Sequence, residues 1–268
     1  MKYTVNHLEL EYQAEGPTCK GPDKVLLDNA IDLTARTSWS DRGYSIEPLF
    51  DATTFGHFCH QTQKLLQDLW SQAGMPESGQ FPLNQYHQFA NTQARHLAAV
   101  ELTKLISVAR FPAEIKTLES RISEICQEEL RVKNPWDGAS NFHFRIIRPK
   151  QTDNNPLHRD VWLEDYANCI NLYIPIAGSN ERSSLIIYPG SHHWPESRVE
   201  RTKNGALING IKFNVPAVTA IDGDPQPMRP DPAPNQVLVF SPYLVHGGSI
   251  NLNEDSTRIS IEVRLWRV

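Results

Sequence analysis

The chain has 268 residues, of which 21% are charged, and its formal net charge is −5 with an isoelectric point near 6.1. Because no sustained run of Lys or Arg occurs, we expect neither nucleic acid nor a membrane surface as the partner, and a small soluble molecule instead. The length allows a single large domain, and no linker-like stretch divides it.

Cysteine usage and the N-terminus indicate the compartment. The four cysteines are scattered, with no C-x-x-C pair and no spacing typical of zinc, as a reducing interior permits. Residues 1–12 lack the apolar run of a secretory signal, and no stretch elsewhere approaches a membrane span. We therefore expect a cytoplasmic protein, whose oligomeric state the sequence leaves open.

The first half of the chain has helical periodicity. Apolar residues recur at steps of three or four over residues 55–70 and again over residues 115–130. Such stripes are typical of supporting helices that pack one face against a core. We predict an N-terminal extension over residues 1–42 and a mostly helical support over residues 43–135.

The second half of the chain is rich in short β-type runs that are broken by turn residues. The predicted strands cover residues 142–147, 169–176, 184–188, 211–215, 237–240 and 258–266. Residues 220–235, rich in proline and aspartate, are predicted to form a surface loop. This pattern predicts a mainly β fold in one domain, with a catalytic β-core over residues 136–268 and the helical half packed outside it.

Three residues of the predicted core form a metal-ligand pattern. His158 and Asp160 lie two residues apart, and His246 follows 88 residues after His158, beside two glycines. Two imidazoles and one carboxylate leave three positions of an octahedral metal open, which is the ligand set of non-haem Fe(II) oxygenases. The absence of cysteine ligands argues against structural zinc. A lone H-x-D is a weak signal, so the context must support it.

The last predicted strand adds a candidate anion receptor. Arg258 opens this strand twelve residues after His246, and from there polar and aliphatic residues alternate. A guanidinium with a neighbouring hydroxyl, here that of Ser260, is a natural receptor for a carboxylate. The pattern therefore indicates a metal site with a carboxylate-binding residue nearby.

Taken in order, these motifs resemble the phytanoyl-CoA dioxygenase-like family of Fe(II)- and 2-oxoglutarate-dependent oxygenases over roughly residues 43–268. The motifs that carry the resemblance are residues 43–50, His158-Arg159-Asp160, residues 184–192, residues 235–240, His246-Gly247 with Asn251, and Arg258-Ile259-Ser260. One departure is Asn235, where the family usually has Gly, and Asn tolerates the left-handed conformation of such a turn.

The resemblance implies a fold and a set of ligands. The fold is a double-stranded β-helix, also called a jelly roll or cupin-like barrel. The resemblance also implies that iron is bound by His158, Asp160 and His246, and that Arg258, helped by Ser260, binds the distal carboxylate of 2-oxoglutarate.

The activity that the resemblance implies uses Fe(II), 2-oxoglutarate and O2 to hydroxylate an unactivated C–H bond, with release of succinate and CO2. Related halogenases have Gly or Ala at the position of Asp160, so an aspartate there implies hydroxylation or a similar oxidation. We expect the substrate to be a small polar metabolite or natural-product intermediate. The sequence does not identify it, nor does it distinguish hydroxylation from desaturation, epimerisation or cyclisation.

Other polar or aromatic residues near the predicted metal site are further candidates. We expect three additional residues to contact 2-oxoglutarate: His143, Asn171 and Tyr173. We expect three to contact the substrate: Trp162, Arg145 and Arg264. For His143 and Arg145 a structural hydrogen bond is the alternative, and for Trp162 it is packing against the barrel rim.

Two other interpretations of the chain stay open. The first is a cupin-type metalloenzyme, an isomerase or direct dioxygenase that does not use 2-oxoglutarate. The 88-residue separation of the histidines is long for a cupin, and Arg258 would then have no role. The second is a non-catalytic barrel that binds a small ligand, which need not retain all three metal ligands together with the arginine.

Overall fold

The computed structural model describes residues 1–75, 81–151, 153–163 and 166–268, in which strands predominate and a few helices flank them. The α-helices are α1 (Ala52–Gln72), α2 (Tyr86–Phe89), α3 (Gln93–Glu101) and α4 (Ile115–Cys126). Short 3-10 turns are η1 (Leu83–Gln85), η2 (Val108–Arg110), η3 (Asp160–Trp162), η4 (Ser191–His193) and η5 (Glu196–Arg198). In these stretches, no helix combines the length and the apolar content that crossing a bilayer requires.

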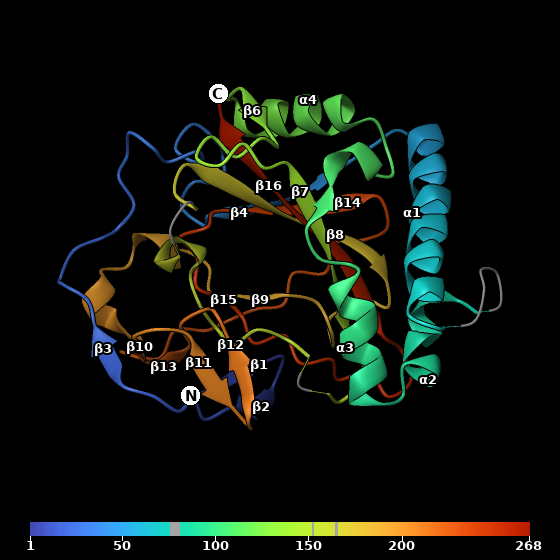
Figure 1. Cartoon of the computed structure of the whole chain (residues 1–268). Helices are drawn as coiled ribbons and strands as arrows, with labels where there is room; N and C mark the ends of the chain where they lie inside the picture. The colour runs from blue at the N-terminus through green and yellow to red at the C-terminus, as the bar shows by residue number, and fades with distance from the viewer. Residues whose placement is uncertain (76–80, 152, 164–165) are drawn as a thin grey trace.

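A seven-stranded antiparallel sheet forms the centre of the fold (Figure 1). The strand order is β4–β14–β8–β16–β7–β5, and β6 pairs with the end of β16. The strands are β4 (Tyr44–Pro48), β5 (Ile106–Ser107), β6 (Leu130–Arg131), β7 (Asn141–Ile147), β8 (Cys169–Ala177), β14 (Gln236–Phe240) and β16 (Arg258–Arg267). The strands predicted at residues 142–147, 169–176, 237–240 and 258–266 are confirmed as β7, β8, β14 and β16.

Smaller ladders form the rest of the β structure. They comprise β1 (Lys2–Val5) with β2 (Leu8–Glu11), β3 (Thr18–Lys20) with β10 (Val199–Thr202) and β13 (Val218–Ile221), β11 (Ala206–Ile208) with β12 (Ile211–Phe213), and β9 (Ile186–Ile187) with β15 (His246–Gly247). The prediction of a helical first half was therefore incomplete, because residues 1–20 contain β1 to β3, whereas β4 lies within residues 43–50, one of the segments that carry the family resemblance. Two of these strands pair with partners far along the chain, β3 with β10 and β4 with β14.

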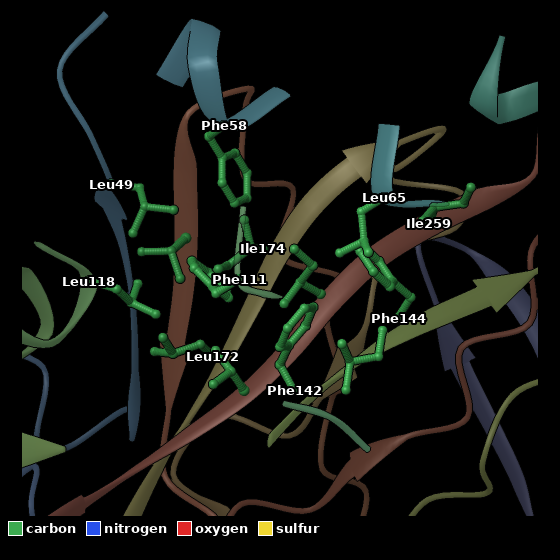
Figure 2. Close-up of a cluster of buried hydrophobic side chains, with 14 of the residues drawn as sticks. Leu49, Phe58, Leu65, Phe111, Leu118, Phe142, Phe144, Leu172, Ile174 and Ile259 are labelled. Atoms are coloured by element: carbon green, nitrogen blue, oxygen red, sulfur yellow. The ribbon is translucent and has the colours of Figure 1, made fainter. Parts of the chain in front are cut away.

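One face of the large sheet is apolar, and helices cover it. Alternate residues of β7, β8 and β16 join residues of α1 and α4 in the main hydrophobic cluster. Figure 2 shows part of this cluster, in which Leu65 of α1 lies beside Phe144 of β7. Phe58 of α1 packs against Phe111, which in turn contacts Phe142 of β7. Helix α1 begins after Asp51, whose carboxylate accepts hydrogen bonds from the first free backbone amides of the helix. Burial of this face anchors the sheet against its helices.

The opposite face of the same three strands is polar. Side chains alternate between the faces of a strand, so the residues between the apolar ones point away from the helices. In the register of the sheet, Glu262 lies opposite both His143 and Tyr173, and Arg264 lies opposite Asn171. Polar groups gathered on a largely buried face must bond to one another or to a ligand. This face therefore forms the floor of the candidate site.

Candidate active site

Backbone pairing brings the two predicted histidine ligands together across 88 residues of sequence. The amide of His158 donates to the carbonyl of His246 at 2.8 Å, and the amide of His246 donates to the carbonyl of His158 at 2.9 Å. The two residues thus form an antiparallel bridge at the end of β15. Gly247 has φ +112°, and a Cβ there would lie 2.3 Å from the carbonyl oxygen of Pro156. This close approach requires glycine.

The side chains of His158, Asp160 and His246 converge on one point. Nε2 of His158 lies 3.2 Å from Oδ1 of Asp160, and Nε2 of His246 lies 3.7 Å from the same oxygen. Each Nδ1 lies within hydrogen-bond distance of a backbone carbonyl, that of Pro156 at 2.8 Å or Leu244 at 2.9 Å. An Nδ1–H that donates there leaves the Nε2 lone pair free for a metal.

These three residues fit a divalent metal. Among the described residues, they are the single group of at least three His, Cys, Asp or Glu side chains whose candidate ligand atoms lie close enough to share an ion. Burial lowers the pKa of His246 to about 4, so its imidazole is neutral, as a ligand must be. Nitrogen and carboxylate donors without thiolate suit iron better than structural zinc.

The second oxygen of Asp160 is already bonded to protein. Oδ2 accepts a hydrogen bond from Nδ2 of Asn171 at 2.9 Å and from the Arg264 guanidinium at 3.0 Å. Burial alone would raise the pKa of Asp160, but Arg264 and the two histidines outweigh it and hold this pKa well below its ordinary value. The carboxylate is therefore ionised and oriented, with Oδ1 facing the histidines.

A row of alternating charges extends from Asp160 across the sheet. Arg264 lies 2.6 Å from Oε1 of Glu262, and Nε of Arg145 donates to Oε2 of Glu262 at 2.5 Å. Burial would raise the pKa of Glu262, yet the two arginines lower it far below its usual range. Both arginines, which were predicted as substrate contacts, thus belong to one network with Asp160, a candidate metal ligand.

The cluster opens into a cavity of about 200 Å³. Among the described residues of its lining are all three candidate metal ligands, together with His143, Arg145, Asn171, Tyr173, Arg258, Glu262 and Arg264. Leu163, Leu185, Val215 and Phe240 supply apolar wall. A small, partly apolar space with a few converging polar groups is typical of a small-molecule site.

Arg258 has the properties of a carboxylate receptor. It is 3% exposed, its NH1 group donates a single long hydrogen bond of 3.4 Å to Ser260, and its guanidinium lies 5.5 Å from the centre of the Tyr173 ring. No ion pair joins it to an acid among the described residues, and its Nε has no hydrogen-bond partner there. A buried guanidinium left so incompletely bonded fits an anionic ligand group.

The other residues that we predicted as cosubstrate or substrate contacts lie in different settings. The hydroxyl of Tyr173 pairs with Ser179 at 2.7 Å, while its ring faces Arg258. Nδ1 of His143 accepts a hydrogen bond from the backbone amide of Leu105 at 3.0 Å. Trp162 lies outside the described cavity lining, and its indole N–H donates to Glu196 at 2.9 Å. The structure therefore brings His143 and Tyr173 to the cavity but not Trp162.

A buried ion pair that we did not predict supports the metal turn. Arg159 lies between the candidate ligands His158 and Asp160, is fully buried, and forms an ion pair with Glu196. It also donates to the backbone carbonyl of Ser191 at 2.7 Å. Neighbouring residues of an extended turn point in opposite directions, so Arg159 points away from the candidate metal cluster. It ties the ligand-bearing turn to the 191–198 segment.

A second unpredicted network lies at the rim of the cavity. Asp153 accepts two hydrogen bonds of 2.9 Å from Arg148 and lies 3.3 Å from Nε2 of His96. Arg148 also donates to the backbone carbonyl of Ala90 at 3.1 Å. The network connects the segment before the metal turn to the start of α3. Its members come from separate segments, and no spacing in the sequence linked them.

Comparisons with known proteins give a family match and a fold match. A family model described as Phytanoyl-CoA dioxygenase (PhyH) matches residues 46–260. No curated protein matches the chain. Among solved structures, AviO1 from Streptomyces viridochromogenes Tue57 is 15% identical, covers 88% of this chain and 95% of its own, and has a TM-score of 0.50. This likeness shows a shared fold.

Two further solved structures are similar at lower TM-scores. EvdO2 from Micromonospora carbonacea var. aurantiaca, complexed with 2-oxoglutarate, is 13% identical over 94% of each chain, with a TM-score of 0.49. EctD from S. alaskensis, with 2-oxoglutarate and 5-hydroxyectoine, is 12% identical over 96% of this chain and 86% of its own, with a TM-score of 0.48.

Proposed function

The chain belongs to the phytanoyl-CoA dioxygenase family, and we propose that it is an Fe(II)- and 2-oxoglutarate-dependent oxygenase that hydroxylates an unactivated C–H bond of a small polar molecule. Family membership and the His158, Asp160 and His246 cluster support the iron- and 2-oxoglutarate-dependent class. The observation that carries the proposal is that one cavity contains both this cluster and Arg258, a buried residue with no acidic partner among the described residues.

Each residue of the site has a role in this proposal. His158, Asp160 and His246 would hold the iron, which together with 2-oxoglutarate would supply oxygen activation with release of succinate and CO2. Hydrogen bonds from Asn171 and Arg264 occupy Oδ2 of Asp160, so that Oδ1 is the oxygen available to a metal. This fixed geometry orders the reactants before the reaction begins.

Arg258 binds the distal carboxylate of 2-oxoglutarate in this proposal. Its guanidinium has one long hydrogen bond to Ser260, so most of its donors are available to a ligand. A cupin-type enzyme that does not use 2-oxoglutarate would leave such a buried charge without a partner. The aspartate at position 160 favours hydroxylation over halogenation, for which related enzymes have a smaller residue there.

The architecture fits the same proposal. We take the large sheet and the β9–β15 ladder as the two sides of a double-stranded β-helix, with the metal cluster between them. The chain would then be one catalytic domain over residues 1–268, in which residues 1–42 extend the β-core and the helices of residues 43–135 support it. The main hydrophobic cluster supports a single domain, because its members extend from Leu33 to Leu265.

The test is an anaerobic titration of the Fe(II)-loaded protein with 2-oxoglutarate, followed by visible absorption. We expect the weak charge-transfer band of a keto acid bound to Fe(II), and its loss in His246→Ala, because one imidazole ligand is then missing. The matched control is His193→Ala, since His193 is exposed and lies outside the described cavity lining. Iron binding without any such band would contradict the proposal and favour the cupin-type alternative.

A further inference from the structure

One guanidinium in the cavity has donors that its protein partners do not use. Nε of Arg145 donates to Glu262, and this is the single hydrogen bond that the Arg145 side chain forms with the described residues. The side chain is 37% exposed and lines the cavity. Its position is fixed from one side by Glu262, so the two terminal N–H groups are held in a defined orientation. Such a fork matches the two oxygens of a carboxylate.

His143 adds a donor next to this fork. It stands two residues before Arg145 on β7, so both side chains lie on the same face of the strand and both line the cavity. Burial lowers the pKa of His143 to about 4, and its Nδ1 accepts a hydrogen bond from the amide of Leu105. The neutral ring therefore carries its proton on Nε2, as a donor.

The charges around the cavity leave one positive charge without compensation among the described residues. Apart from Asp153, the described lining contains three arginines and two carboxylates, so that positive charges outnumber negative ones by one: Arg145, Arg258, Arg264, Asp160 and Glu262. Asp153 also lines the cavity, but two hydrogen bonds from Arg148 already neutralise it. A divalent metal and a dianionic cosubstrate would cancel each other. A confined positive charge favours an anionic partner.

We infer that Arg145, with His143 beside it, binds a carboxylate group of the primary substrate, which makes this enzyme specific for a small carboxylic acid. The inference rests on the proposed function, because it takes Arg258 as the residue that binds 2-oxoglutarate. The row Arg145–Glu262–Arg264–Asp160 connects this receptor to a metal ligand. The bond to be oxidised then lies in the part of the acid that extends from Arg145 toward the metal.

The experiment is an affinity selection on protein loaded with Zn(II) and saturating 2-oxoglutarate, so that the metal site is filled and no turnover occurs. The probe is an equimolar mixture of small carboxylic acids and their primary amides, and mass spectrometry quantifies what is retained. We expect the wild type to retain acids over the matched amides by about tenfold or more, the size of one charge-assisted hydrogen bond. Arg145→Gln should bring this ratio within about twofold of one.

Two further variants keep the test decisive. Arg145→Gln leaves Glu262 with a single cationic neighbour, so we also use Arg145→Gln/Glu262→Gln, which removes both charges of the pair. This double variant should lose the acid preference as well. The matched control is Arg95→Gln, the same substitution at an exposed position of α3, and it should retain the preference of the wild type.

The outcomes separate this inference from the proposed function. A wild type that does not prefer acids, or an Arg145→Gln variant that still does, would overturn the inference. A loss of 2-oxoglutarate binding in Arg145→Gln would overturn it too, because Arg145 would then serve the cosubstrate. The Fe(II) titration is independent: a missing keto-acid band contradicts the proposed function, whereas a normal band without acid selection contradicts only the inference.

Discussion

Replacing Arg258 by methionine should have opposite effects on cosubstrate binding and on stability. In the protein without ligand, the guanidinium is buried with one hydrogen bond of 3.4 Å and no acidic partner among the described residues. Methionine removes this poorly compensated charge and keeps much of the side-chain volume. We expect the free energy of unfolding to be unchanged or raised by about 1 kcal/mol.

The affinity for 2-oxoglutarate should fall steeply in the same variant. Removing one member of a buried charge pair costs about 2–5 kcal/mol, because the other charge remains buried without a partner. At 1.36 kcal/mol per tenfold, the dissociation constant should rise by about 30-fold or more. The anaerobic Fe(II) titration measures this constant directly. In denaturant unfolding of the metal-loaded wild type, 2-oxoglutarate at 100 times its dissociation constant should add about 2.7 kcal/mol, and the variant should lose most of this gain.

Arg229→Met is the matched control for stability. Arg229 is also buried, but it donates to the backbone carbonyls of Ser184 at 3.0 Å and Ile250 at 2.9 Å. Its removal leaves two carbonyls unbonded, so we expect a loss of about 2 kcal/mol or more. Arg258→Met with unchanged 2-oxoglutarate affinity, or with a stability loss as large as that of Arg229→Met, would refute the role of Arg258 as a ligand receptor.

Three other predictions follow from the site and its supports. Asn171→Ala should weaken metal binding about 10- to 100-fold in a competition with a chelator, because Oδ2 of Asp160 loses a donor. Burial lowers the pKa of His96 to about 4 while the unfolded chain keeps about 6.5, so the stabilising contribution is complete above pH 6.5 and is lost as pH falls toward 4. Urea unfolding at pH 7.5 and 4.5 should show a smaller acid-induced loss in His96→Gln, by up to about 3 kcal/mol. Gly247→Ala should lower the thermal midpoint and the bound iron together, because the new Cβ would meet the carbonyl of Pro156.

The sequence predicted the strands whose pattern is local. Apolar and polar residues alternate over residues 141–146 of β7 and residues 258–265 of β16, and this period of two is sufficient to recognise a strand with one apolar face. Strands β1, β2 and β4 of the first 48 residues alternate as well, but they are too short for the pattern to identify them. Strands β1 to β4 are three to five residues long, and β3 and β4 exist because they pair with β10 and β14, more than 170 residues away. Pairing at that distance depends on the complete fold.

The same distinction applies to the site. The metal cluster and Arg258 follow from residue types at recognisable spacings, whereas their supports depend on the direction of individual side chains. Glu262 stands between two arginines on the polar face of β16, so alternation alone could have indicated it. Glu196 and Asp153 lie outside the strands and carried no signal. Trp162 lies in a 3-10 turn rather than a strand, which turns its ring toward Glu196.

The two faces of β16 have a consequence for protein engineering. Even-numbered positions from Arg258 to Arg264 lie on the site face, and the odd-numbered positions from Ile259 to Leu265 belong to the hydrophobic cluster. A variant library restricted to the even positions would therefore change side chains of the site and leave the residues of the hydrophobic cluster unchanged. Positions 262 and 264 would need to vary jointly, since their charges compensate each other. The site residues that can be redesigned and the core residues that must be preserved thus lie on opposite faces of the same strand.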